Sequence, residues 1–326
     1  MSRHSVPVIR VFFIDIGSAP GFPARRVQVT SAGSRRETAS ALAESERTGG
    51  AMVIVTCTGR LGISVICTTP ACNEWNIMKI VVIGGTGLIG SKVIVKLKAH
   101  GHDAVAASPN TGVNTITGEG LSEALHGADV VVDVTNSPSY EDQAVMDFFT
   151  TSTAHLIAAE KETGVNHHVA LSIVGVERPS DGGYFKAKAA QEQLIRDSGL
   201  PYSIVHATQF FEFLGGIADT ATDGDTVTLP PVSFQPVAAD DVAAAVARAA
   251  VGAPVNGIVD IAGPEIGRFD EIIGRALQSR DDHRKVVADP AAPYFGAHVS
   301  ERSLIPEGDS PRGEITLAAW LEASAE

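Results

Sequence analysis

The stretch that most constrains the fold is MKIVVIGGTGLIG, residues 78–90. The apolar, largely β-branched residues 79–83 predict a short buried strand, and glycines follow at positions 84, 87 and 90. Gly84 allows a sharp turn, Gly87 lets the backbone approach a pyrophosphate, and Gly90 lets helix and strand pack closely. The next residues, SKVIVKLKAHG, predict a helix ending near Gly101, and HDAVAAS (102–108) predicts a second strand. This order is typical of a dinucleotide-binding βαβ unit, in which the helix N-terminus holds phosphates.

From Met78 onward, apolar β-branched runs alternate with Ala-rich amphipathic stretches. This alternation predicts an α/β fold with a Rossmann-type doubly wound parallel sheet. We expect one domain over residues 78–326, with a smaller C-terminal substrate-binding part over about residues 208–326.

Residues 1–77 have a different character. They contain eight Arg, no Lys and five acidic residues, together with all three cysteines, and they show no repeated pattern. One interpretation is a disordered or targeting extension, since Arg-rich, acid-poor segments are typical of transit peptides. Our preferred hypothesis is that Met78 is the natural start and that the preceding residues play no role in the fold.

Charge and hydropathy exclude several classes of partner. The net charge of −13 argues against binding to nucleic acid, which needs a basic face. No apolar run approaches the length of a membrane span, so we expect a cytoplasmic protein that acts on a small molecule. The cysteines form no CxxC pair, and the adjacent His167 and His168 on a predicted strand point to opposite faces, so we expect no metal site.

The end of the second strand normally selects the cofactor, because an acidic residue there binds the adenosine ribose hydroxyls of NAD. Here the sequence reads AASPNTG and contains no acid. Ser108, Asn110 and Thr111 carry donors for a 2′-phosphate, although the arginine typical of NADP-binding proteins is missing. The sequence therefore favours NADP(H) over NAD(H).

A candidate catalytic group lies further along the chain. HHVALSIVGVE (167–177) predicts a buried strand that ends near Ser172, and GGYFKAKAAQEQLIRDSG (182–199) predicts a helix. In that helix Tyr184 and Lys188 share one face. Lys188 is placed to stabilise a Tyr184 phenolate and to hold the nicotinamide ribose, while Ser172 orients a substrate carbonyl. The alternative is that Lys188 and Glu192, also four residues apart, form a surface ion pair.

A candidate substrate pocket follows the strand YSIV. TQFFEFLGG (208–216) begins where the carboxyl edge of the sheet opens to a ligand, and Gln209, Phe210, Phe211 and Phe213 are its candidate lining residues. Ordinary core packing explains the aromatic residues equally well. The stretch YFGAHVSERSLIP (294–306) is a candidate cover for the pocket.

Several segments taken in order resemble one known family. They are VVIGGTGLIGSKVIVKLKAHGHDAVAAS, GADVVVDVTNSPS, LSIVGVE, YFKAKAAQEQLIRDSGLPYSIVHATQFFEF, PVAADDVAAAVARAA and NGIVDIAGPE. Together they resemble an atypical short-chain dehydrogenase/reductase of the NmrA-like NAD(P)-binding type over residues 78–326. The resemblance implies that Lys188 contacts the nicotinamide ribose, Ser108 the adenosine ribose, and Thr135 and Asn136 the middle of the cofactor. It also implies a pyrophosphate over Gly84, Gly85, Thr86, Gly87, Leu88, Ile89 and Gly90.

The sequence departs from the family at places that bear on catalysis. His206-Ala207 stands where the family often has Arg-Pro, and TGEGL replaces the usual acidic stretch, which leaves Glu119 as a candidate adenine neighbour. We expect an NAD(P)H-dependent oxidoreductase that reduces a carbonyl, an enone or a quinone-like molecule, with Tyr184 as proton donor. The main alternative is a non-enzymatic NADP(H)-binding redox sensor with a regulatory protein partner. An epimerase or dehydratase is a third possibility.

Overall fold

The computed structural model describes residues 53–58, 62–67, 77–176, 178 and 182–324. The chain divides into two compact units, Met1–Asn76 and Ile77–Glu326. In the first unit, strands β1 (Val53–Thr58) and β2 (Gly62–Cys67) pair antiparallel. The expectation of a disordered or non-native extension falls mostly on residues outside the described ranges.

The second unit is built around a six-stranded sheet with the order β11-β7-β6-β5-β3-β4. Every neighbouring pair in it is parallel, which confirms the predicted Rossmann-type α/β fold. The strands are β3 (Lys79–Ile83), β4 (Asp103–Ala107), β5 (Val130–Asp133), β6 (His167–Ile173), β7 (Tyr202–Ala207) and β11 (Gly257–Ile261).

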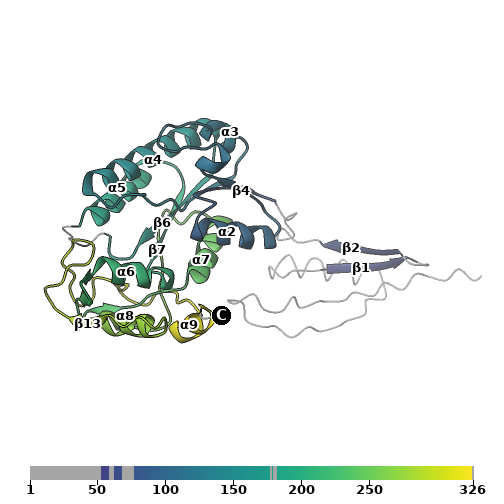
Figure 1. The fold of residues 1–326 in the computed structure, drawn as a ribbon. Helices are drawn as coiled ribbons and strands as arrows, with labels where there is room; N and C mark the ends of the chain where they lie inside the picture. The colour runs from purple at the N-terminus through teal and green to yellow at the C-terminus, as the bar shows by residue number, and fades with distance from the viewer. Residues whose placement is uncertain (1–52, 59–61, 68–76, 177, 179–181, 325–326) are drawn as a thin grey trace, which may run out of the picture. The chain divides into compact units, whose positions relative to one another are not determined.

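Helices cover both faces of this sheet (Figure 1). Ile80 and Val82 of β3 belong to the core formed with α2 (Leu88–Ala99) and α7 (Ala239–Val251). Val81 and Ile83 belong to the opposite core, which is formed with α3 (Leu121–Leu125) and α4 (Asp142–Thr163). Helix α5 (Gly183–Asp197) packs beside α4. Because both faces are buried there, residues 80–83 of β3 and 130–132 of β5 are continuous apolar runs without alternation.

The strand order places a switch point beside β3. The chain leaves β3 for β4 on one side and then crosses to β5 on the other. Ligands of open α/β sheets bind outside the carboxyl ends of the strands at such a point. The described residues 108–120 contain the short helix η1 (Pro109–Thr111) and turns but no strand, so the sheet ends at β4.

A second, smaller core lies in the C-terminal part. It contains the stacked rings of Phe234 and Phe269, whose centroids are 4.2 Å apart. The intervening α7 and β11 return to the main sheet, so the smaller part is not the single segment that a boundary at about residue 208 implies. Its elements are η2 (Phe211–Phe213), α6 (Leu214–Thr220), β8 (Thr222–Asp223), β9 (Thr226–Leu229), β10 (Ser233–Phe234), β12 (Gly267–Arg268), α8 (Phe269–Gln278), β13 (Lys285–Ala288) and α9 (Leu317–Ser324).

Among the residues that the structure describes, no helix combines the length and the apolar character needed to cross a bilayer.

Candidate functional site

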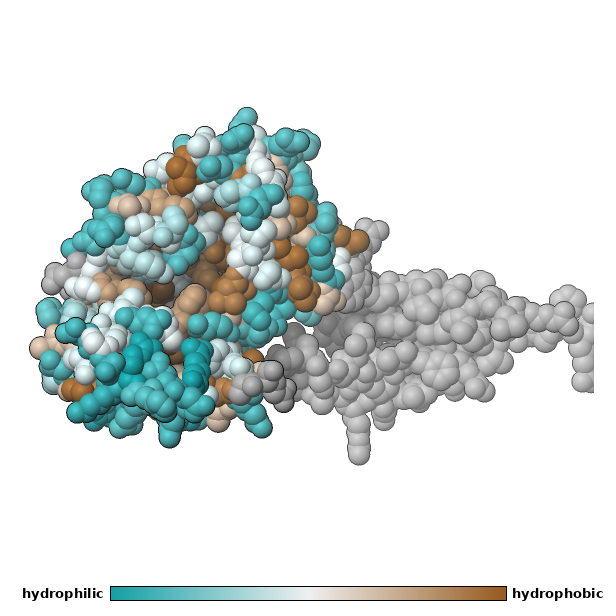
Figure 2. All heavy atoms as spheres, in the orientation of Figure 1, coloured by the Kyte–Doolittle hydropathy of each residue, from teal (hydrophilic) through white to brown (hydrophobic). Residues whose placement is uncertain are grey.

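A cavity of about 770 Å³ opens at the carboxyl edge of the sheet. It extends from the turn after β3, past the ends of β4, β5, β6 and β7, to α6 and residues 294–295 of the C-terminal part. On the face drawn in Figure 2, apolar side chains gather around a hollow between the layer with α4 and α5 and the part with α6 and α8. Pockets for small molecules and cofactors have this size and this apolar character.

The glycine turn forms one wall of the cavity. The glycines at positions 84, 87 and 90 have different structural roles in it. Gly84 has φ +77°, the left-handed conformation that glycine adopts without strain. A Cβ on Gly90 would lie 2.6 Å from Cα of Gly85, so helix α2 packs against the turn only without a side chain there. A Cβ on Gly87 would meet only the Gly84 carbonyl oxygen, at 3.3 Å. Gly87, with Leu88 and Ile89 at the start of α2, lines the cavity, whereas Gly85 and Gly90 pack behind it.

Three buried polar atoms at the cavity wall have no hydrogen-bond partner within the described part of the chain. They are Oγ of Ser108, Oγ1 of Thr208 and Oε1 of Gln209. Buried polar groups are normally satisfied, so orphaned groups that line one cavity indicate a polar ligand. Together with the N-terminus of α2 and the uncrowded Gly87, these groups fit a nicotinamide dinucleotide stretched across the ends of the strands.

The end of β5 is held in place by Asp133. Its Oδ1 accepts hydrogen bonds from the Thr135 backbone N–H at 2.9 Å and from the Thr135 hydroxyl at 2.7 Å. Its Oδ2 accepts from Nε2 of Gln191 on α5 at 3.0 Å. Asp133 is buried and fixes the loop from which Thr135 and Asn136 line the cavity.

Lys188 is the one charged side chain among the described residues that line the cavity. Its Nζ donates to the Leu171 carbonyl oxygen at 2.8 Å and to Oε1 of Gln191, and it lies 4.5 Å from the centroid of the Phe149 ring. Burial lowers the pKa of the Lys188 ammonium to about 8, although the carboxylates of Asp133 and Glu192 act in the opposite direction. The suggested surface ion pair with Glu192 is wrong, because both side chains are 2% exposed and Lys188 bonds elsewhere.

Tyr184 lines the cavity near Asn136, and its hydroxyl donates to Oδ1 of Asn136 at 3.1 Å. Burial, with a smaller contribution from Tyr140, raises the pKa of the Tyr184 phenol well above its usual range. The stabilisation of a Tyr184 phenolate by Lys188 stays a prediction. The phenol remains protonated and acts as a hydrogen-bond donor.

Ser172 also lines the cavity, but its hydroxyl has a partner that the sequence did not indicate. Ser172 Oγ donates to Oε1 of the buried Glu192 at 2.5 Å. Nε2 of His206 lies 2.8 Å from the same oxygen, and Arg196 donates to Oε2 at 2.8 Å. These donors hold the pKa of the Glu192 carboxyl below its usual range. Burial acts in the opposite direction and by itself would raise that pKa.

Aromatic side chains line the end of the cavity that lies nearest to the C-terminal part of the chain. The Tyr140 ring lies 5.8 Å from that of Tyr184 and stacks on Phe295 at 5.5 Å, while Phe210 stacks on Phe213 at 5.3 Å. Such rings bind flat, conjugated molecules well. Phe211, expected in the pocket wall, does not line the cavity and packs instead in the C-terminal core, 5.6 Å from the Trp320 ring.

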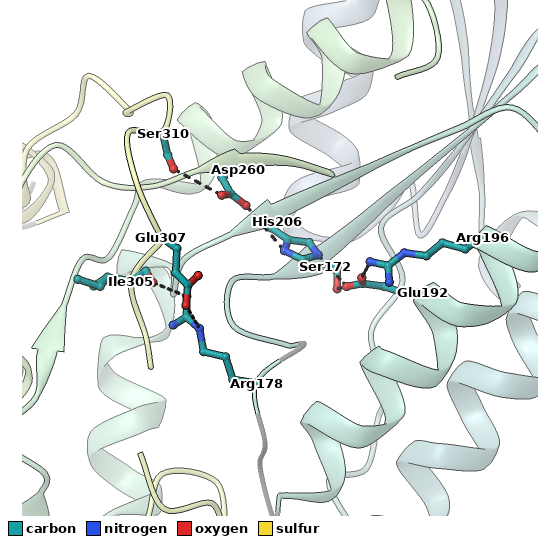
Figure 3. Close-up of polar contacts among 9 residues, drawn as sticks. All are labelled: Ser172, Arg178, Glu192, Arg196, His206, Asp260, Ile305, Glu307 and Ser310. Carbon is teal, nitrogen blue, oxygen red and sulfur yellow. Dashed lines mark hydrogen bonds and ion pairs between the residues drawn. The ribbon is translucent and has the colours of Figure 1, made fainter. Parts of the chain in front are cut away.

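Two residues of the segment suggested as a cover, Tyr294 and Phe295, line the cavity. Figure 3 shows Arg178, from the loop after β6, beside Ile305 and Glu307 farther along the C-terminal segment. The Arg178 guanidinium donates to the carbonyl oxygens of Arg302 at 2.5 Å and Ile305 at 2.9 Å. These contacts tie the loop after β6 to the C-terminal segment.

The structure brings most of the candidate residues to one cavity. The expected residues that line it are Gly84, Thr86, Gly87, Leu88, Ile89, Ser108, Thr135, Asn136, Ser172, Tyr184, Lys188, Gln209, Phe210 and Phe213. Sequence reasoning missed Thr208, Tyr140, Phe148 and the stretch 113–116, whereas Glu119, the candidate adenine neighbour, does not line the cavity. Only Thr208 carried a local signal, since it directly follows β7 at the ligand-binding edge.

Within the described residues, no group of three or more His, Cys, Asp or Glu side chains is arranged to hold a metal ion.

The fold and the cavity define a Rossmann-type dinucleotide-binding protein. Residues 84–251, just over half of the chain, match the family described as NAD(P)H-binding, and the chain belongs to that family. A solved short-chain dehydrogenase/reductase superfamily protein from Agrobacterium tumefaciens with bound NAD has the same fold. The two structures superpose with a TM-score of 0.59, and their sequences are 17% identical. The superposition covers 76% of this chain and 96% of that one.

Three curated relatives are similar over part of their length. The chain is 27% identical to divinyl chlorophyllide a 8-vinyl-reductase of Cucumis sativus, over 57% of this chain and 52% of that protein. It is 27% identical to photosystem II assembly factor Ycf39 of Cyanophora paradoxa, over 46% and 51% respectively. It is 32% identical to NAD(P)H azoreductase of Xenophilus azovorans, over 41% and 49%. The chain thus spans about half the length of these relatives.

Proposed function

We propose that this protein is an NmrA-like, NADP(H)-preferring reductase of a flat, conjugated small molecule, such as an enone, a quinone or an aromatic carbonyl compound. The observation that carries the proposal is one continuous cavity with two chemically different halves. The half at Gly87, Ser108 and Thr135 offers polar groups to a dinucleotide, and the half at Tyr184 and Phe210 offers aromatic rings. A cytoplasmic location is part of the proposal.

The residues divide into binding and orienting roles. Gly87 and the start of α2 hold the pyrophosphate, Ser108 the adenosine ribose, and Lys188 the nicotinamide ribose. When bound, the reduced nicotinamide supplies a hydride. Tyr184, kept protonated, turns its O–H from Asn136 Oδ1 to the substrate oxygen and polarises the double bond that is reduced.

Two relatives support a conjugated substrate by their names, one as a vinyl-reductase and one as an azoreductase. The test is to titrate the purified chain with NADPH, NADH, NADP⁺ and NAD⁺ by calorimetry. NADPH oxidation is then followed with quinones, enones, aryl azo compounds and vinyl-substituted tetrapyrroles. We expect NADPH binding and turnover of at least one of these classes. Failure of every acceptor despite tight NADPH binding would overturn the reductase proposal.

A second candidate is a dinucleotide-binding protein that acts on a protein partner. It is favoured by the similarity to an assembly factor and by a Tyr184 phenol whose pKa burial raises, so that it holds its proton firmly. This function requires a protein partner whose binding depends on whether NADPH or NADP⁺ is present. Affinity capture carried out with each form, together with the acceptor panel, distinguishes the two candidates.

A further inference from the structure

A row of polar side chains crosses one half of the sheet. Ser172 on β6 pairs in register with His206 on β7, and His206 pairs with Asp260 on the edge strand β11. Strands of parallel sheets covered by helices are normally apolar, as β3 and β5 are here. Figure 3 shows His206 between Asp260 and the pair formed by Ser172 and Glu192.

Hydrogen bonds join Ser172, Glu192 and His206, and a longer ion-pair contact joins His206 to Asp260 at the edge of the sheet. Oε1 of Glu192 accepts from Ser172 Oγ at 2.5 Å and from His206 Nε2 at 2.8 Å, so a single oxygen joins the two donors. On the other side of the ring, Nδ1 of His206 lies 3.7 Å from Oδ1 of Asp260. Ser172, Glu192 and His206 are each 2–3% exposed, whereas the Asp260 side chain is 28% exposed. Asp260 is thus the most exposed of these four residues and lies at the end of the row away from the cavity.

The row does not match the two familiar uses of such groups. In a hydrolytic triad the imidazole contacts the serine hydroxyl, but here Glu192 lies between Ser172 and His206. As a purely structural element the row lowers the stability of the fold, because removing a carboxylate and an imidazole from water costs free energy. Hydrogen bonds to every polar atom are needed to offset that loss. An apolar row would pack without that cost.

We propose that Asp260, His206, Glu192 and Ser172 form a proton relay that supplies the proton consumed when the substrate is reduced. The inference rests on the reductase function proposed above. After hydride addition to one atom of the double bond, the other atom carries the electron pair. The Ser172 O–H bond breaks as that atom takes the proton. In the same transfer the Nε2–H bond of His206 breaks and its proton passes by way of Glu192 Oε1 to Ser172 Oγ, so that Glu192 is a carboxylate before and after the step. Water at the Asp260 end restores the proton on the ring, so the net addition is one hydride and one proton from water.

The relay gives Tyr184 and Ser172 separate tasks. Tyr184 donates to Asn136, and its phenol holds its proton firmly, which suits it to orient the substrate. Ser172 is connected to a group that can be reprotonated from solvent without opening the cavity. His206 and Glu192 act through Ser172 and are positioning residues of this proton path.

The first test uses the free protein and needs no turnover. Exchange of the His206 ring N–H protons with water is measured by NMR in wild type, Glu192→Gln and Asp260→Asn. If Asp260 is the point of entry, Asp260→Asn slows this exchange several-fold. A merely structural Asp260 predicts unchanged or faster exchange, and that result would overturn the relay.

The second test uses NADPH and an acceptor that the wild type reduces. Glu192→Gln and His206→Gln should lower kcat on the order of 10²-fold, with KM and the Kd for NADPH nearly unchanged and a larger solvent deuterium isotope effect. The matched control is His167→Gln, because His167 is another buried histidine on β6, bonded to Ser203 Oγ at 2.9 Å and outside the cavity lining. It should keep the wild-type kcat and isotope effect.

The outcomes separate the relay from the proposed function. If wild type reduces an acceptor but Glu192→Gln keeps both kcat and the isotope effect, only the relay is overturned. If wild type binds NADPH and reduces nothing, the reductase function fails and the relay fails with it. Asp260→Asn leaves the buried core intact, so the exchange measurement remains decisive even where His206→Gln does not fold.

Discussion

The Tyr184 hydroxyl donates a hydrogen bond to Oδ1 of Asn136 across 3.1 Å and thereby joins the first turn of α5 to the loop after β5. Both residues line the cavity, at the boundary between its polar half and its aromatic half. A substrate oxygen at this boundary would meet a phenol that is already oriented. The conformational entropy of orienting this phenol is thus lost on folding, before the substrate binds.

This arrangement predicts the effect of Tyr184→Phe. Because the phenol contributes a hydrogen bond to the substrate and no contact to the phosphates, kcat/KM should fall by about 10- to 100-fold, equivalent to about 1–3 kcal/mol. The Kd for NADPH should stay within about twofold of wild type, since hydrogen bonds to other groups dominate dinucleotide binding. Steady-state kinetics and calorimetry check both values. Tyr202→Phe on β7, outside the cavity, is the control, and equal losses in the two variants would contradict the assignment.

The glycine turn predicts opposite outcomes for two neighbouring substitutions. In Gly90→Ala the new methyl group meets the backbone of Gly84 and Gly85, so α2 must shift and the thermal unfolding midpoint should drop by several degrees. In Gly87→Ala the methyl group meets only one oxygen at 3.3 Å and points into open space, so the fold should tolerate it. Its methyl group should instead weaken NADPH binding by about tenfold or more, because it blocks close approach of the phosphates. Thermal unfolding and calorimetry on both variants check the contrast, which disappears if Gly87 faces no ligand.

Ser108 predicts the cofactor preference. It directly follows β4, its buried hydroxyl has no hydrogen-bond partner among the described residues, and neither sequence neighbour is acidic. Wild type should therefore bind NADPH more tightly than NADH. Ser108→Asp should reverse the order, because a carboxylate repels a 2′-phosphate and accepts from the ribose hydroxyls. Competitive titrations of the two reduced cofactors measure the ratio, and an unchanged ratio in Ser108→Asp would place the adenosine ribose elsewhere.

The parts of the fold that could be predicted from sequence are those encoded locally. The strand, glycine turn and helix at residues 79–99 follow from spacing alone, because Gly84 is required by its own left-handed backbone conformation and Gly90 by its contacts with Gly84 and Gly85. The parallel arrangement of the strands likewise follows from alternating βα units. No local pattern marks α7 and β11 as members of the main sheet, although the segments on either side of them form the smaller core.

The candidate site was only half predictable for the same physical reason. Lys188 and Glu192 lie on one helix, and their spacing suggested an ion pair, but burial on α5 turns Glu192 toward Ser172 and His206 on two different strands. Phe211 and Phe213 lie two residues apart, and which of them faces the cavity depends on the short helix η2 that contains both. Contacts between distant segments, such as Tyr140 with Phe295, leave no signal in either segment alone.

His167 predicts how stability depends on acid. Burial first, and then the charge of His168, lower the pKa of the His167 imidazole to about 4. Between pH 6.5 and 4 the unfolded chain therefore binds a proton that the native protein does not, so the free energy of unfolding falls as the pH falls through this window. The shift corresponds to at most about 3 kcal/mol. In His167→Gln this part of the pH dependence disappears, while the difference from wild type at pH 8 reports only the altered hydrogen bond to Ser203. Urea unfolding at several pH values measures both curves, and parallel curves for wild type and variant would show that His167 is protonated in the native protein.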